Sequence, residues 1–204
     1  MKKAFIFWDD SNIFISAKTV ASAREGPDAY DQIRTDFQKL LDLAQDNREL
    51  ESAIAVGSIP PPLRHVWNRL EQLGVKVEIY ERGSYSDKEQ AVDQALQIHM
   101  LRTAFDYIGD PGVVVMLTGD GKGFLDGVGF HADLERMHCR GWEIEVLAWE
   151  RTCNPRMKKW AQAFGLFIPL ELFYESVTFT EDQGVVLRRS APLDVTHRPR
   201  KTQT

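Results

Sequence analysis

Three aspartates in this sequence occupy positions from which their carboxylates could act together. Asp9 directly follows the apolar run Ala4–Trp8, and Asp120 lies three residues beyond the apolar run Val113–Leu117. Asp93 lies in an amphipathic stretch, about 10 Å along a predicted helix at 1.5 Å of rise per residue. A lone aspartate at a strand end is commonly a helix cap or a turn former. Three carboxylates at one edge, however, repel one another unless a cation neutralises them. Oxygen ligands suit Mg²⁺ or Mn²⁺ better than zinc, so the three together predict a divalent-metal site.

The elements that must position these aspartates alternate between short apolar runs and stretches of helical periodicity. Ser86 and Glu89 form a capping box that opens a helix through about Phe105, and Asn154 with Pro155 opens another helix. This alternation predicts an α/β fold, a three-layer sandwich with a mainly parallel central sheet. Ligands of such sheets bind beyond the carboxyl ends of the strands, where the strand order reverses. The predicted strands are Ala4–Trp8, Ser52–Val56, Val75–Tyr80, Val113–Leu117 and Glu143–Trp149.

The chain is predicted to form one domain with a short C-terminal addition. Residues 1–175 contain the alternating pattern and no linker. Within residues 176–189, two apolar stretches flank Glu-Asp-Gln-Gly and predict an appended hairpin. Residues 190–204 are polar and basic and predict a disordered tail.

Composition excludes several classes of protein. The 204 residues are 43% hydrophobic and 27% charged, as in an average globular domain, and include only two cysteines. That cysteine content excludes a disulfide-rich secreted scaffold and indicates a reducing compartment. No apolar run approaches the roughly 20 residues that span a bilayer. We therefore expect a cytoplasmic protein with no membrane partner.

The charge of the chain is unevenly distributed. The formal net charge is −5, but residues 188–204 contain five basic residues and one acidic residue, which leaves −9 on the rest. An acidic body would disfavour a nucleic-acid partner unless part of its acidity ligates a metal ion, which reverses the local charge. The basic tail could contact RNA phosphates, although solvated disorder requires no partner.

Three motifs resemble those of the NYN branch of the PIN-like nucleases, the group that includes LabA-like proteins. FWDDSNIF at residues 7–14 resembles a strand followed by Asp-Gly-Ser-Asn and a hydrophobic residue. KEQAVD at residues 88–93 resembles a Lys-x-x-x-Val-Asp helix motif, and TGDG at residues 118–121 resembles the start of Ser-Gly-Asp-x-Asp-Phe. The resemblance extends from about Ala4 to Leu170 and implies a PIN-like fold.

The resemblance implies a metal-dependent ribonuclease that hydrolyses phosphodiester bonds of single-stranded RNA. Asp9, Asp93 and Asp120 would be the catalytic metal ligands for Mg²⁺ or Mn²⁺. Ser11 and Asn12 would hold the first carboxylate or a phosphate oxygen. One or two ions would activate a water and stabilise the leaving oxygen.

Two departures from the family pattern leave the metal site incomplete. The family motif has a further aspartate before its phenylalanine, whereas this chain continues from Asp120 with Gly121 and Lys122. A second alignment matches Phe130 to the phenylalanine of the motif, and Gly129 then stands in place of the aspartate. Asp126 or Asp10 could replace the fourth acid. His99 also stands where many relatives have a second aspartate on the long helix.

These departures keep a second hypothesis open, a non-catalytic RNA-binding or regulatory module with a degraded site. A phosphatase on another doubly wound fold ranks third, because Asp93 fits it poorly. Lys122, in a glycine-rich segment, could bind substrate phosphate, although that segment could also be a plain surface loop. The sequence leaves the oligomeric state undecided, with a homo-oligomer among the alternatives.

Overall fold

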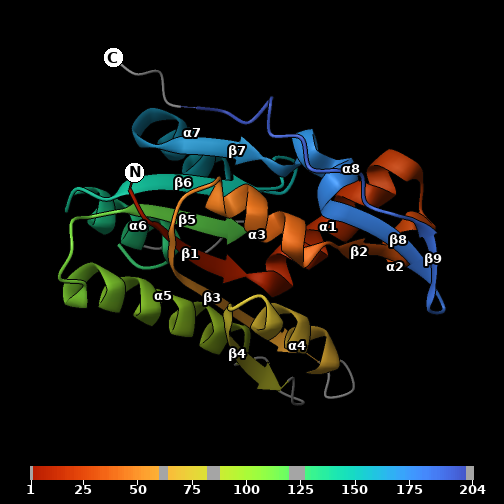
Figure 1. The fold of residues 1–204 in the computed structure, drawn as a ribbon, viewed down its shortest axis with the longest axis horizontal. Coiled ribbons are helices and arrows are strands. Elements are labelled where there is room, and N and C mark those ends of the chain that lie inside the picture. The colour runs from red at the N-terminus through yellow and green to blue at the C-terminus, as the bar shows by residue number, and fades with distance from the viewer. Residues whose placement is uncertain (1, 60–63, 82–87, 120–126, 201–204) are drawn as a thin grey trace.

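The computed structural model describes residues 2–59, 64–81, 88–119 and 127–200, and a six-stranded parallel sheet lies at its centre (Figure 1). The strand order is β4-β3-β1-β5-β6-β7. Counted along the chain within this sheet, the order is 3-2-1-4-5-6, so it reverses between β1 and β5. The predicted fold class is confirmed. The strands are β1 (Ala4–Asp9), β3 (Leu50–Ile59), β4 (Lys76–Glu81), β5 (Val113–Thr118), β6 (Glu143–Ala148) and β7 (Leu166–Pro169).

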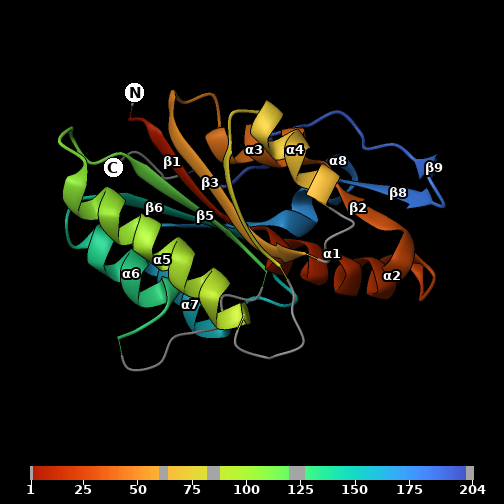
Figure 2. The ribbon, with the colours of Figure 1, turned by 90° about the horizontal axis from the view of Figure 1, so that it is seen from below.

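Helices cover both faces of the central sheet (Figure 2). Along β1, Ile6 and Trp8 face the cluster that contains α1, α3 and α4, whereas Phe5 and Phe7 face the cluster of α5, α6 and α7. Trp8 is fully buried and packs edge-on against Phe37 with ring centroids 5.8 Å apart. The helices are α1 (Asp10–Glu25), α3 (Phe37–Gln45), α4 (Arg64–Gln72), α5 (Lys88–Asp106), α6 (Phe130–His138) and α7 (Pro155–Phe164).

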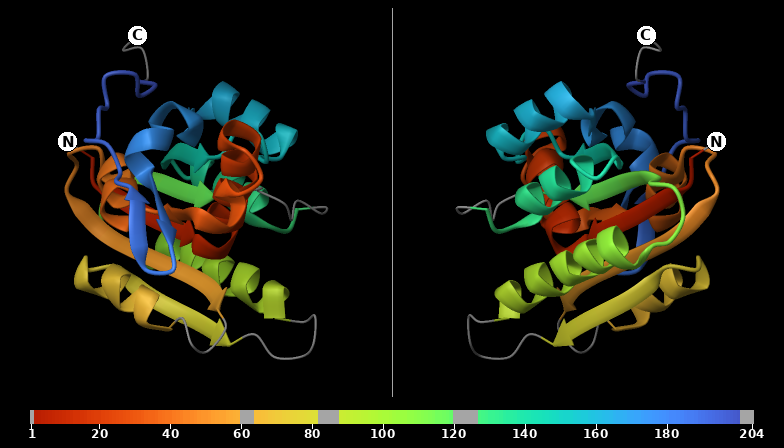
Figure 3. Two further views of the ribbon diagram at one scale, coloured as in Figure 1. Left: turned by 90° about the vertical axis from the view of Figure 1, so that its right-hand side faces the viewer. Right: turned by 90° about the vertical axis from the view of Figure 1, so that its left-hand side faces the viewer.

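A small antiparallel sheet lies at one end of the molecule, beside α1 (Figure 3). Its strands β8 (Thr178–Asp182) and β9 (Val185–Arg188) form a hairpin, and β2 (Ile33–Thr35) pairs with β8. The sequence pattern does not predict β2 or β7, because three or four residues are too few to show a period. The connections are α2 (Ala29–Gln32), the 3₁₀ turn η2 (Leu170–Phe173) and α8 (Tyr174–Val177).

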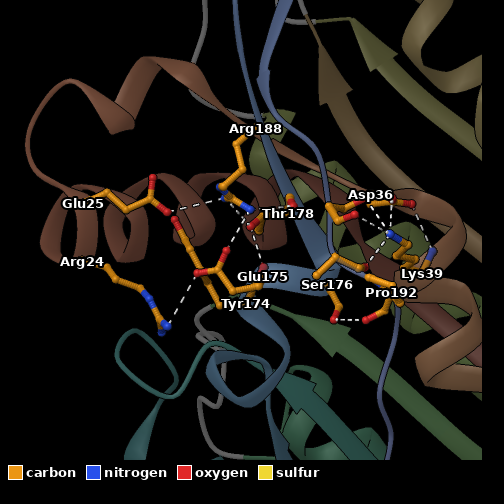
Figure 4. Close-up of polar contacts among 12 residues, drawn as sticks. Arg24, Glu25, Asp36, Lys39, Tyr174, Glu175, Ser176, Thr178, Arg188 and Pro192 are labelled. Carbon is orange, nitrogen blue, oxygen red and sulfur yellow. Dashed lines mark hydrogen bonds and ion pairs between the residues drawn. The ribbon is translucent and has the colours of Figure 1, made fainter.

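Arg188 at the end of β9 joins the small sheet to α1 and α8 (Figure 4). Its guanidinium lies 3.5 Å from Glu25 and 3.1 Å from Glu175, and it also donates to the backbone oxygen and hydroxyl of Thr178. Arg24 lies 3.7 Å from the same Glu175. The hairpin is therefore fixed to the domain by charged contacts.

The C-terminal segment differs from the disordered tail expected over residues 190–204. Within the described residues 190–200, Ser190 donates to Asp36 at 2.6 Å, and Lys39 donates to the carbonyl of Ala191 at 2.7 Å (Figure 4). Further along, the side chain of Arg198 is 1% exposed and lies 2.7 Å from Glu145. The composition of this segment is that of a solvated tail, but Arg198 and Arg200 are paired with acids whose side chains are buried in the domain.

The five basic residues at positions 188–204 therefore differ in their surroundings. Arg188, Arg198 and Arg200 form ion pairs within the chain, Arg189 is exposed, and Lys201 lies outside the described residues. Among the described helices, none is both long and apolar enough to cross a membrane.

Candidate metal and nucleic-acid site

The carboxyl ends of β1 and β5 lie side by side where the strand order reverses. In the parallel pairing of these strands, Trp8 is opposite Leu117. Asp9 ends β1 and Thr118 ends β5, and both side chains are fully buried. The structure thus brings Asp9 and the described start of the second motif, Thr118 and Gly119, to one edge of the sheet, where open α/β folds bind ligands.

Asp9 is the N-cap of α1, and Asn12 fixes its carboxyl group. Asp9 Oδ1 accepts a hydrogen bond from the backbone N–H of Asn12 at 3.2 Å, and Oδ2 accepts one from the Asn12 side-chain amide at 2.5 Å. The Asp-x-x-Asn spacing therefore serves both the cap and the orientation of the carboxylate. Asn12, expected either to hold this carboxylate or to bind phosphate, does the former.

Gly119 allows the end of β5 to approach the first turn of α1. A Cβ atom at Gly119 would lie 1.9 Å from the carbonyl oxygen of Asn12 and 2.4 Å from Ser16 Oγ. From the other side, the Thr152 hydroxyl donates to the Gly119 carbonyl at 2.7 Å. Because of this close approach, Gly119, the last described residue before Asp120, lies directly beside the turn that holds Asp9.

Asp93 lies on α5, which packs across β3 and β1, and its side chain is half-buried. One turn further, the Gln97 amide nitrogen donates to the carbonyl oxygen of Asp93 at 3.2 Å, and Gln97 Oε1 accepts from the backbone N–H of Gly129 at 3.1 Å. Gln97 therefore ties the Asp93 turn of α5 to the far end of the segment that begins at Gly119.

Sequence reasoning missed both residues that hold this segment. Gln97 is four residues from Asp93, hence on the same face of the helix, and that spacing could have indicated it. Thr152 gave no signal, because nothing in the sequence places the turn after β6 next to Gly119.

Several predicted site residues lie outside the part of the chain that the structure describes. They are Asp120, Lys122 and Asp126. Among the described residues, no three His, Cys, Asp or Glu side chains form a cluster that could hold a metal ion. Of the predicted ligands, the structure describes Asp9 and Asp93, on two elements that contact each other.

Asp10 is a second buried acid beside Asp9. Among the described residues its Oδ1 is buried and has no hydrogen-bond partner, and burial raises the pKa of its carboxyl to about 7. Ser11 is half-buried, and its Oγ would lie 3.1 Å from a Cβ built at Gly57 of β3. Asp9, Asp10 and Ser11 therefore provide oxygen atoms at the start of α1, and oxygen is the ligand that a hard cation such as Mg²⁺ prefers.

The two departures from the family pattern have structural consequences. His99 Nε2 lies 2.7 Å from Glu78 Oε1, so this histidine of α5 pairs with a glutamate of β4. Although burial alone would raise the pKa of Glu78, its hydrogen bonds with His99 and Lys76 lower it. Gly129 has φ of +102°, a conformation that L side chains rarely adopt. An aspartate at position 129 would therefore be strained in this backbone.

A family model described as the NYN domain matches residues 3–166 of this chain. The chain belongs to the NYN family. The NYN family is generally nuclease-like, which supports a ribonuclease type of function for the arrangement described above. No curated protein matches the chain.

The NYN fold of this chain is also similar to a solved structure. It resembles the crystal structure of a protein of unknown function from Vibrio parahaemolyticus, with a TM-score of 0.57 and 17% sequence identity. The similarity covers 91% of this chain and 96% of the Vibrio protein. At this identity it supports the fold alone, and it does so over nearly the whole of both chains.

Proposed function

We propose that this NYN protein is a divalent-metal-dependent ribonuclease that hydrolyses phosphodiester bonds of single-stranded RNA. The main support is Asp9, which is fully buried at the carboxyl end of β1 and whose two oxygens are oriented by Asn12. A structural N-cap needs only the backbone contact. The second hydrogen bond, from the Asn12 side chain, instead fixes the rotation of the carboxyl group, as a metal ligand requires.

The residues at this edge fit a hard divalent ion in their chemistry. Asp9, Asp93 and Asp120 would hold Mg²⁺ or Mn²⁺, with Asp126 or Asp10 as a further acid. The buried Oδ1 of Asp10, which has no hydrogen-bond partner in the part of the chain that the structure describes, is consistent with a cation near the start of α1. When bound, such an ion supplies an activated water and neutralises the charge on the leaving oxygen.

The other residues of the site would act by position. Asn12 orients Asp9, while Gly119 and Thr152 fix the point from which the chain proceeds to Asp120. Gln97 holds the opposite end of that segment against the turn that contains Asp93. Four elements, β1, β5, α5 and the turn after β6, thus meet around one edge.

Cleavage of a labelled single-stranded RNA tests the proposal. We expect cleavage with Mn²⁺ and none with excess chelator. Asp9→Asn and Asp120→Asn should each lower the rate by about 100-fold or more, and Asn12→Ala by about 10- to 100-fold, the usual effect of losing a partner of a metal ligand. Asp110→Asn is the matched control, because Asp110 is exposed and precedes β5 at the opposite edge. Equal rates for Asp120→Asn and the wild type would refute the catalytic claim.

The alternative is a non-catalytic RNA-binding or regulatory module. The pairing of His99 with Glu78 and the conformation of Gly129 favour it, because neither position provides an additional acid. Calorimetry separates the two functions. The nuclease should bind Mn²⁺ in a manner that Asp9→Asn weakens, whereas tight RNA binding without binding of the ion would indicate the module.

A further inference from the structure

The turn after β6 and the start of α7 form the most basic short segment of this acidic protein. Residues 151–159 read RTCNPRMKK, with four basic residues and no acidic residue, in a chain of net charge −5. Arg151, Arg156 and Lys159 are exposed. We refer to these three residues as the α7 basic patch.

The α7 basic patch lies beside the candidate metal site. Just before it, the Trp149 indole donates to the carbonyl of Ile13 in the first turn of α1 at 3.0 Å, and Thr152 within the segment donates to Gly119 at 2.7 Å. On its other side is His131 in the first turn of α6, whose ring centroid lies 5.2 Å from that of Trp160 on α7. Burial lowers the pKa of His131, and the nearby charge of Arg156 lowers it further, against the opposing effect of Glu135. The patch therefore adjoins both ends of the segment that contains Asp120.

The stability of the fold does not account for these charges. Lys158 pairs with Glu150 and lies over the ring of Phe167, but within the described chain Arg151, Arg156 and Lys159 form no ion pair. Arg156 and Lys159 also lie in the first turns of α7, where the helix dipole disfavours positive charge. Clustered cations at this end of a helix repel one another, and an anion placed against them would relieve that repulsion.

We propose that Arg151, Arg156 and Lys159 bind successive phosphates of the RNA strand next to the scissile bond. This inference rests on the proposed function, because it assigns a path to the substrate of that site. Arg156 and Lys159 are one turn apart on one face of α7, about 5 to 6 Å between Cβ atoms. An acidic edge repels a polyanion, so a neighbouring group of unpaired cations provides the attraction that holds the strand there.

Fluorescence anisotropy with a labelled single-stranded RNA, in chelator to prevent cleavage, tests this path. The test variant is Arg151→Ala/Arg156→Ala/Lys159→Ala in the full chain. The matched control is Lys2→Ala/Lys76→Ala/Arg102→Ala, which removes the same charge from the amino edge of the sheet, where Lys2 precedes β1, Lys76 begins β4 and α5 ends. Circular dichroism melting checks that both variants are folded.

We expect the test variant to bind RNA at least about 10-fold more weakly at low salt. Its plot of log affinity against log salt should be shallower by about 2, since each lost phosphate contact of a single strand contributes about 0.7. The control should change affinity less than about 2-fold. Equal weakening in both variants would overturn the proposal, as would no weakening in the test variant. A wild type that binds an acidic protein but no RNA would overturn it too.

Kinetics with Mn²⁺ separate this inference from the proposed function. If both are correct, the test variant should raise KM with little change in kcat, because it keeps the metal ligands. If RNA binding depends on the patch but wild type and Asp9→Asn are equally inactive, the proposed function fails and the inference about the surface stands. If cleavage depends on Asp9 but RNA binding is unchanged in the test variant, the proposed function stands and the inference about the surface fails.

Discussion

Replacing Arg198 with alanine should cost this protein more stability than its place near the C-terminus suggests. Arg198 Nη2 lies 2.7 Å from Glu145 Oε2 and Nη1 lies 3.2 Å from Asp46, with both acids buried. Arg48 donates to both carboxylate oxygens of Glu145 at 2.8 Å, so Oε2 accepts from both arginines. The substitution would remove one cation from this group, in which Arg48, Arg198 and Arg200 surround two acids, and leave the buried carboxylates with less compensation.

The size of the effect follows from these contacts. Removing one partner of a buried ion pair typically costs 3 to 5 kcal/mol. Because Glu145 keeps Arg48 and Asp46 keeps Arg200, we place Arg198→Ala near the low end, at about 3 kcal/mol. For a chain of this size that corresponds to a melting temperature lower by about 6 to 12 °C. Arg200→Ala, whose side chain is 55% exposed, should cost less than about 1 kcal/mol.

Chemical denaturation of the two variants at pH 7 measures this difference. Burial opposes ionisation of Glu145, but its contacts with Arg48 and Arg198 lower its pKa overall. Its ionic contribution is therefore complete at pH 7 and is lost as the pH falls through its lowered pKa, so the cost of Arg198→Ala should shrink in acid. If Arg198→Ala is no less stable than Arg200→Ala, the C-terminal segment is not held as described.

Three further predictions concern the sheet edge. Burial raises the pKa of Asp10 from 3.8 to about 7, so between these pH values Asp10 is protonated only in the folded protein and the free energy of unfolding should fall as the pH rises. In chelator, Asp10→Asn should therefore be more stable than the wild type by up to about 4 kcal/mol at pH 8 and by little at pH 4. A difference that does not depend on pH would contradict this. Gly119→Ala should lower the free energy of unfolding by about 1 to 3 kcal/mol and reduce RNA cleavage, because the added Cβ would clash with Asn12. A variant with unchanged melting temperature and unchanged cleavage would be inconsistent with that contact. Gly129→Asp should destabilise the protein by about 1 to 3 kcal/mol in thermal melts and not increase activity, because its φ is +102°; a more active variant would show that the backbone adapts.

The two central strands, β1 and β5, were predictable because they are nearly continuous apolar runs. β1 and β5 are buried along their whole length, as expected for parallel strands covered on both faces. The start of α7 was also readable, since Asn154 accepts from the backbone N–H of Arg156 and Pro155 occupies the first turn. Local signals of this kind are complete within a few residues of sequence.

The C-terminal segment and the support of the site could not be read from the sequence. Residues 190–200 look like a solvated tail because the acids that bind Arg198 come from distant parts of the chain, Asp46 and Glu145. Gln97 and Thr152 likewise act on residues about 30 positions away. Interactions of that range depend on the tertiary fold, so composition and periodicity do not show them.

Crystals grown with Mn²⁺ and measured at a wavelength where manganese scatters anomalously would test the central claim most directly. We predict an anomalous peak at the carboxyl edge of β1 and β5, in contact with carboxylate oxygens of Asp9, Asp93 and Asp120, and no peak there in Asp9→Asn. A protein that cleaves RNA with Mn²⁺ while this edge holds no ion, or holds one that none of these aspartates contacts, would contradict the account.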